Sequence, residues 1–286
     1  MQTFKTLMLR EWMQHRLGWL LLGSVPFVIM VPLMMFGEVH FGDTPPPPGF
    51  AALIIAFGYI FFLLVLAGGA VAIQAPGLAR RDRQDRSIEF WLSLPVGHSA
   101  SIGATLLMHL LAMPLLLLGM AAIGSPVAAL LGEMRVHGAA VLGQVPWGTA
   151  MLVFVAGVAR LALGIVLAML WLSPLLLAMM AASAWLKRWG VPVLGAVLGF
   201  GGLLLKEGYH QPFVFDAIDS LFVHARDALL PQNIDLSPSA PMVRLAQWVG
   251  EDALRALADL ATPSFVVGLV IAAGGFGLMV LRRSRG

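Results

Sequence analysis

The fold class is decided by residues 50–73, FAALIIAFGYIFFLLVLAGGAVAI, which contain no charged side chain. A helix that crosses the roughly 30 Å hydrocarbon core of a bilayer needs about 20 apolar residues, and this stretch is longer than that. A spanning segment must also satisfy its backbone hydrogen bonds internally, which an α-helix does. Residues 50–73 therefore predict a membrane-spanning helix.

Apolar stretches of similar length occur elsewhere in the chain, and together with residues 50–73 they predict six spans. The others are Gly18–Phe36, Ser101–Leu131, Trp147–Leu186, Trp189–Leu205 and Pro263–Leu281. Residues 147–186 would be about 60 Å long as one helix. This stretch either projects well beyond the outer surface or begins with a separate surface segment. We expect an all-α membrane protein whose 286 residues form a single transmembrane domain.

Composition agrees with this class and excludes others. Hydrophobic residues make up 59% of the chain and charged residues 12%, with a mean hydropathy of +0.87, whereas soluble domains carry about 25% charged residues. Because there is no cysteine, disulfides, thiol catalysis and cysteine metal ligands are excluded. The net charge of +3 comes from basic clusters between apolar stretches, which is typical of membrane topology rather than of nucleic-acid binding.

The distribution of Lys and Arg predicts the orientation. If both termini lie inside, the inner segments hold 12 of the 18 basic residues and 4 of the 15 acidic residues. An excess of Lys and Arg in short loops marks the cytoplasmic side. The 15 arginines against three lysines indicate a GC-rich bacterial genome. We expect a multi-pass protein of the bacterial cytoplasmic (inner) membrane with both termini in the cytoplasm.

Two segments outside the spans show amphipathic patterns. Residues 1–17 place Phe4, Met8 and Trp12 at i, i+4 and i+8, which predicts an interfacial helix anchored in the lipid of the inner leaflet. Residues 206–262 predict two amphipathic helices that pack as a small extracytoplasmic cap. The apolar face of the first holds Ile218, Leu221, Phe222, Ala225 and Leu229, and that of the second holds Leu245, Val249, Leu257 and Leu260, opposite a polar stripe of Gln247, Glu251, Arg255 and Asp259.

The inner loop between the second and third spans, residues 74–99, is the most informative for function. It holds seven charges between Arg80 and Glu89 and then presents Phe90, Trp91 and Leu94. Pro95 ends any helix here. A short amphipathic helix on the cytoplasmic side is a docking element for a soluble partner. The alternative is a positive-inside cluster followed by an aromatic membrane anchor.

At this loop the chain resembles the ABC-2 type family of bacterial transporter permeases. The matching residues are Asp85-Arg86-Ser87-Ile88-Glu89-Phe90-Trp91-Leu92-Ser93-Leu94-Pro95-Val96. Many relatives continue with Ser and an acidic residue, whereas this chain has Gly97-His98. The stretches Arg10-Glu11-Trp12, Ser183–Arg188 and Pro263–Arg283 are also similar to the family.

The resemblance implies the membrane subunit of an ATP-driven exporter. Two copies would form the path for an amphiphilic cargo, such as an antibiotic, a peptide or a lipid-like molecule, and a separate ATPase subunit would hold ATP and Mg²⁺. The residues that would couple to that ATPase are Asp85, Arg86, Ser87, Glu89, Phe90, Trp91, Leu94 and Pro95. The chain itself has no G-x-x-x-x-G-K-[ST] motif, so we expect no catalytic site and no cofactor in this subunit.

Two polar residues within the apolar stretches need an explanation. Arg160 lies about 40 Å from Lys187 along a continuous helix, where it would snorkel to the outer headgroups. His109 lies in the third span and is expected to be a hydrogen-bonded packing residue. An ion- or proton-coupled transporter is the main alternative function, but it needs buried carboxylates, and this topology places all 15 acids outside the hydrocarbon. An intramembrane enzyme is disfavoured because no H-E-x-x-H motif or paired carboxylate occurs within the spans.

Overall fold

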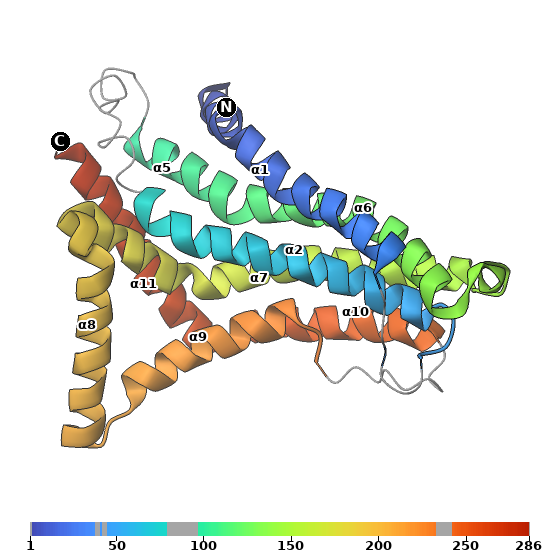
Figure 1. The fold of residues 1–286 in the computed structure, drawn as a ribbon. Helices are drawn as coiled ribbons and strands as arrows, with labels where there is room; N and C mark the ends of the chain where they lie inside the picture. The colour runs from blue at the N-terminus through green and yellow to red at the C-terminus, as the bar shows by residue number, and fades with distance from the viewer. Residues whose placement is uncertain (1, 38–40, 42–44, 79–96, 233–241, 286) are drawn as a thin grey trace.

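The computed structural model describes residues 2–37, 41, 45–78, 97–232 and 242–285, and these form a bundle of long helices (Figure 1). The α-helices are α1 (Gln2–Phe36), α2 (Phe50–Leu78), α5 (His98–Leu106), α6 (Met113–His137), α7 (Trp147–Leu186), α8 (Gly190–Leu203), α9 (Phe213–Leu229), α10 (Met242–Ala258) and α11 (Pro263–Ser284). The described residues also form two π-helical turns, η1 (Leu107–Ala112) and η4 (Leu204–Gly208), and three 3₁₀ turns, η2 (Ala139–Gly143), η3 (Lys187–Trp189) and η5 (Asp259–Ala261).

Five helical stretches within the described residues are long and apolar enough to cross a membrane. They are Phe4–Phe36, Phe50–Leu78, His98–His137, Trp147–Gly208 and Pro263–Ser284. The all-α class is confirmed. The fourth stretch contains both α7 and α8, which were expected as two spans. In Figure 1, α8 turns sharply away from α7 after η3. The count of six spans stays a prediction.

α7 is one unbroken helix of 40 residues, so of the two alternatives for this stretch the separate surface segment is excluded and the single continuous helix remains. No proline or glycine cluster interrupts its first half, and an apolar helix of this kind continues until a breaker or a turn intervenes. The turn comes at Lys187, whose φ is 55°. It also needs Gly190, because a Cβ there would lie 2.4 Å from the carbonyl carbon of Ala182.

α1 is also continuous and runs through Leu17, where the sequence places the boundary between an interfacial helix and a first span; that boundary stays a prediction. Only Gly18 stands at that position, and a single glycine costs about 1 kcal/mol in a helix interior. Of the three predicted anchor residues, Met8 and Trp12 pack against the core, and Phe4 is 36% exposed. Anchoring in lipid stays a prediction for these residues.

The core lies where α2 packs against α6 and α7. Ile60 and Leu63 of α2 and Leu117 of α6 are completely buried. One core cluster gathers around Trp19 and Met180, and a second gathers around Ile60. The burial of these side chains holds the long helices side by side, since each fully buried large apolar side chain contributes about 1.5–3 kcal/mol.

α9 and α10 pack along the flank of α7 between Val153 and Trp171. Ala225 and Ala256 contact the α7 cluster around Trp171, while Leu245 packs against Val153. The predicted polar stripe of α10 is exposed, as expected. The predicted apolar faces are partly wrong: Phe222 and Leu257 are exposed, at 51% and 43%, while Asp252, Ala228 and Ala256 are buried.

One end of the bundle collects several helix ends that are distant in sequence. The start of α1, the end of α2, the start of α5 and the end of α11 all lie at this end (Figure 1). The basic residues Lys5, Arg10, Arg282 and Arg283 belong to these helix ends. η2, which joins α6 to α7, lies at the opposite end. We call the end that holds the start of α1 and the end of α11 the basic end of the bundle.

Candidate functional site

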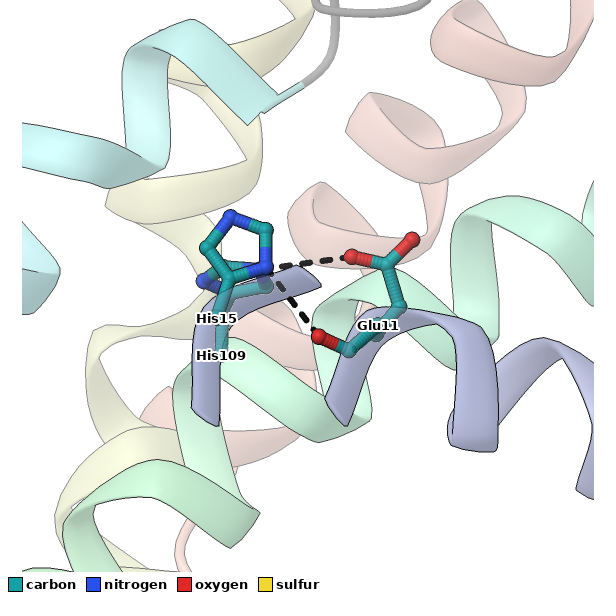
Figure 2. Close-up of side chains that lie close together, drawn as sticks. All are labelled: Glu11, His15 and His109. Carbon is teal, nitrogen blue, oxygen red and sulfur yellow. Dashed lines mark hydrogen bonds and ion pairs between the residues drawn. The ribbon is translucent and has the colours of Figure 1, made fainter. Parts of the chain in front are cut away.

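A glutamate and two histidines come together between α1 and η1. α1 supplies Glu11 and His15, one turn apart, and η1 supplies His109 (Figure 2). One ligand atom from each of the three lies within 4.8 Å of the others. Glu11 is completely buried and His109 is 2% exposed. This polar cluster is therefore part of the interior.

Helical periodicity explains how α1 aligns its part of the site. Glu11, His15 and Trp19 are spaced at i, i+4 and i+8, which places them on one face of the helix. His109 fits against this face: its ring centroid lies 4.6 Å from that of His15 and 5.3 Å from that of Trp19, both in edge-on geometry. It sits in a π-helical turn, and such turns often occur at functional sites.

The two carboxylate oxygens of Glu11 have different surroundings. Oε1 pairs with the guanidinium of Arg10 and accepts a hydrogen bond of 3.2 Å from the hydroxyl of Thr105. Oε2 lies 3.4 Å from Nε2 of His109. Arg10 and Thr105 therefore fix the carboxylate by one oxygen and direct the other at His109.

The histidine rings also differ in their contacts. Nδ1 of His15 lies 3.1 Å from the carbonyl oxygen of Glu11, and a carbonyl can only accept, so Nδ1 donates and Nε2 of a neutral ring keeps its lone pair. Among the described residues, neither ring nitrogen of His109 has a hydrogen-bond partner. His109 is packed in the interior as expected, but the expected hydrogen bond is not found in the part of the chain that the structure describes; instead Nε2 faces Oε2 of Glu11 at 3.4 Å.

A cleft of about 640 Å³ lies beside this site, between α1 and α2. His15 and Trp19 line it, together with the polar side chains of Gln14 and Gln74. His15 thus belongs both to the buried cluster and to the cleft wall.

Arg160 forms a second buried polar site. Its Nε donates a 2.8 Å hydrogen bond to Oδ2 of Asp252 on α10, and its Nη2 also lies 2.8 Å from that oxygen. Its Nη1 donates to the carbonyl oxygen of Ala228 on α9, at 2.6 Å. Arg160 and Asp252 are buried. The expectation that Arg160 snorkels is therefore wrong: the residue joins α7 to both α9 and α10.

An apolar pocket of about 420 Å³ opens beside Arg160, between α2, α7 and the α9–α10 pair. Phe57, Phe61, Leu161 and Trp248 are among the residues that line it. Ligand pockets typically have volumes of about 300–1,000 Å³ and mostly apolar walls with few polar groups. This pocket has the size and lining that an apolar portion of a ligand needs.

A third buried acid, Glu133, lies near the opposite end of the bundle from the basic end. It is completely buried; its Oε1 accepts a 3.4 Å hydrogen bond from the backbone N–H of Gly49 and lies 3.0 Å from Nδ1 of His137. Together with Glu11 and Asp252, Glu133 makes three buried acids among the residues that the structure describes. Ion coupling needs buried carboxylates, and these three are buried within the protein; the expectation that all 15 acids lie outside the hydrocarbon stays a prediction.

The predicted ATPase-coupling residues fall within residues 79–96, which lie outside the described residues. They are Asp85, Arg86, Ser87, Glu89, Phe90, Trp91, Leu94 and Pro95. The described helices place the two flanks of this segment, the end of α2 and the start of α5, at the basic end of the bundle (Figure 1).

The fold and the long apolar helices define the class as an all-α protein with the features of a multi-pass membrane protein. Comparisons with protein-family models, with curated proteins and with solved structures found no match for the chain. Any more specific function therefore has to be argued from the residues and their geometry.

Proposed function

We propose that this chain is the transmembrane permease subunit of an ATP-driven exporter of the ABC-2 type. A separate ATPase subunit would bind residues 85–94 on the cytoplasmic side, and a second copy of the chain would complete the transport path. The cargo would be amphiphilic, and this subunit would carry no catalytic site of its own.

The observation that carries this proposal is the gathering of helix ends at the basic end of the bundle. The two helix ends that flank residues 79–96, the end of α2 and the start of α5, lie at the same end of the bundle as the start of α1 and the end of α11 (Figure 1). Because Lys5, Arg10, Arg282 and Arg283 occur in these helices, the positive-inside rule favours a cytoplasmic position for this end. A docking segment for a cytoplasmic ATPase has to leave the bundle there.

The apolar pocket beside Arg160 supports the cargo class. Its walls are aromatic and aliphatic, and Arg160 is the charged residue in its lining. Such a pocket would accept the hydrocarbon part of an amphiphile by the hydrophobic effect. A bulky replacement, Gly157→Leu, would reduce the pocket, because a Cβ at this position already lies 2.4 Å from Cζ of Phe57. We expect this change to lower export of long-chain amphiphiles more than export of short-chain ones.

Binding of the ATPase subunit to residues 85–94 is tested by affinity capture of this chain from native membranes. A variant with Arg86→Ala, Glu89→Ala and Trp91→Ala should lose the co-purifying ATPase and cargo-stimulated ATP hydrolysis. The matched control changes Arg80, Arg81 and Arg83 to alanine, since the positive-inside rule alone accounts for these three. If the first variant keeps its ATPase partner and full activity, residues 85–94 are not the docking element and the proposal is wrong.

A second candidate function is an ion- or proton-coupled transporter, and the Glu11–His109 contact favours it. A buried carboxylate beside a histidine is a typical proton- or ion-binding arrangement in transporters. The two functions are separated by transport in vesicles at constant ATP while the proton gradient is collapsed. An ATP-driven exporter continues to transport, whereas a proton-coupled one stops.

A further inference from the structure

We infer that Glu11, His15 and His109 form a binding site for a divalent transition-metal ion of the borderline class, such as Zn²⁺, Co²⁺ or Ni²⁺. Two imidazoles and one carboxylate are a donor set that suits these ions. The site would join α1 to η1 inside the protein. This inference is independent of whether the chain works with an ATPase.

The spacing of the donor atoms fits a single metal ion. Zinc bonds to His nitrogen and carboxylate oxygen are about 2.0–2.2 Å long, so two ligands at a tetrahedral angle lie about 3.3–3.5 Å apart. Nε2 of His109 and Oε2 of Glu11 are 3.4 Å apart. The three ligand atoms lie within 4.8 Å of one another, so one ion bound to all three would draw the donors together toward the roughly 3.3–3.5 Å spacing of a tetrahedral site.

His109 supplies the second, independent indication of a ligand. Its side chain is 98% buried, and neither ring nitrogen has a hydrogen-bond partner among the described residues. Buried polar atoms are normally satisfied. A metal ion between Nε2 of His109 and Oε2 of Glu11 would satisfy this nitrogen and would also explain why an imidazole is placed here.

The groups around the ligands resemble the second shell of a metal site. Ligand histidines usually donate their other ring N–H to a carbonyl or carboxylate, and Nδ1 of His15 has this contact with the carbonyl oxygen of Glu11. The hydroxyl of Thr105 holds the carboxylate by the oxygen that faces away from His109. These contacts orient two of the three donors before an ion arrives.

The cleft between α1 and α2 provides the access route. His15 lines the cleft, so an ion that enters from the cleft meets His15 first and the buried Glu11 and His109 next. Three protein ligands leave a fourth tetrahedral position for water or another small ligand, and Gln14 and Gln74 give the cleft polar groups that can hold it.

Arg10 sets the expected strength of binding. Its guanidinium pairs with Glu11, so it repels a divalent cation at short range and offsets part of the carboxylate charge. We therefore expect Arg10→Gln to tighten metal binding several-fold. A structural ion pair without a metal site gives no such increase.

The test uses the purified full-length protein in detergent micelles, with an affinity tag that contains no histidine. Co²⁺ is titrated and followed by the visible absorption of its tetrahedral complex, and Zn²⁺ binding is measured by calorimetry. We expect about one ion per chain in the unaltered protein. His15→Phe and His109→Phe should each weaken binding by at least about tenfold, a lower bound taken from the 10–100-fold losses seen for outer-shell changes.

Two controls keep the result interpretable. His210→Phe removes an exposed histidine outside the cluster, and this variant should bind like the unaltered protein. Glu11→Gln keeps the shape of the side chain, so it reports the loss of a donor charge even if a histidine variant unfolds. Saturating Zn²⁺ should raise the thermal midpoint of the unaltered protein and of His210→Phe, but not that of Glu11→Gln. Unchanged binding in both His109→Phe and Glu11→Gln, or no absorption from Co²⁺ in the unaltered protein, would overturn the inference.

Discussion

Replacing Asp252 with leucine would leave the buried charge of Arg160 without its partner. In the unaltered protein, Nε and Nη2 of Arg160 both lie 2.8 Å from Oδ2 of Asp252, and Nη1 donates to Ala228. All of these groups lie where α7, α9 and α10 meet. The change therefore tests whether this contact holds the α9–α10 pair against α7.

The magnitude follows from the burial of the pair. Breaking a buried ion pair by removing one partner costs about 3–5 kcal/mol of stability, because the remaining charge is uncompensated. We expect that loss for Asp252→Leu and a similar loss for Arg160→Met. The double variant removes both charges and leaves the carbonyl of Ala228 without its donor and the backbone N–H of Gln232 without its acceptor, each of which costs about 1–3 kcal/mol. The two changes should thus be strongly non-additive, with a coupling energy of several kcal/mol.

The assay is equilibrium unfolding in mixed micelles with an increasing fraction of denaturing detergent, followed by tryptophan fluorescence and circular dichroism. The control is Arg255→Met, which removes an exposed pair with Glu251 at 3.6 Å and should cost less than about 1 kcal/mol. If the double variant loses as much stability as the two single variants summed, Arg160 and Asp252 do not act as a pair and the reasoning is refuted.

Three further predictions test packing and orientation. Trp171→Ala removes a buried side chain that stacks on His224 and contacts Phe265, and it should lower the free energy of unfolding by about 3–5 kcal/mol in the same assay. Gly164→Val places a Cβ 2.5 Å from the carbonyl oxygen of Ala228. It should therefore push α9 away from α7 and lower the free energy of unfolding by about 1–3 kcal/mol in the same assay. Because the chain contains no cysteine, Ser284→Cys should react with an impermeant thiol reagent only after permeabilisation, whereas Gln144→Cys should react in intact cells; the reverse pattern would contradict the proposed orientation.

The positions of the long helices could be predicted from sequence because hydrophobicity and helix breakers act locally. α7 has the predicted bounds, Trp147–Leu186, and α11 begins at the predicted Pro263. The errors lie where the choice between alternatives depends on tertiary packing. A weak breaker such as Gly18 can end a helix or lie inside one, and contacts of α1 with α5 and α6 decide the outcome.

The sequence predicts the wrong environment for Arg160 because distance along a helix does not reveal what packs beside it. Because α7 is continuous, the rise per residue places Arg160 about 40 Å from Lys187 along the helix. That height suits snorkelling only if the helix faces lipid or water at Arg160. Here α9 and α10 cover this face, and the covering carboxylate, Asp252, lies 92 residues further along the chain. Asp252 falls between the predicted polar and apolar faces of α10, and that intermediate position was the signal in the sequence.

The Glu11 site could have been found from the register of α1. Phe4, Met8 and Trp12 give an apolar row at i, i+4 and i+8, but Leu7, Glu11, His15 and Trp19 give a second row on the neighbouring part of the helix. The structure buries the second row, with Leu7, Glu11 and Trp19 at 5%, 0% and 3% exposure. A row that contains a charged residue is buried only if a partner satisfies it. The combination of an acid and a histidine one turn apart on an otherwise apolar row therefore points to a polar partner on another helix, and His109 was the candidate within the spans. The metal titration of His109→Phe and Glu11→Gln tests whether the contact between Glu11 and His109 binds a metal ion.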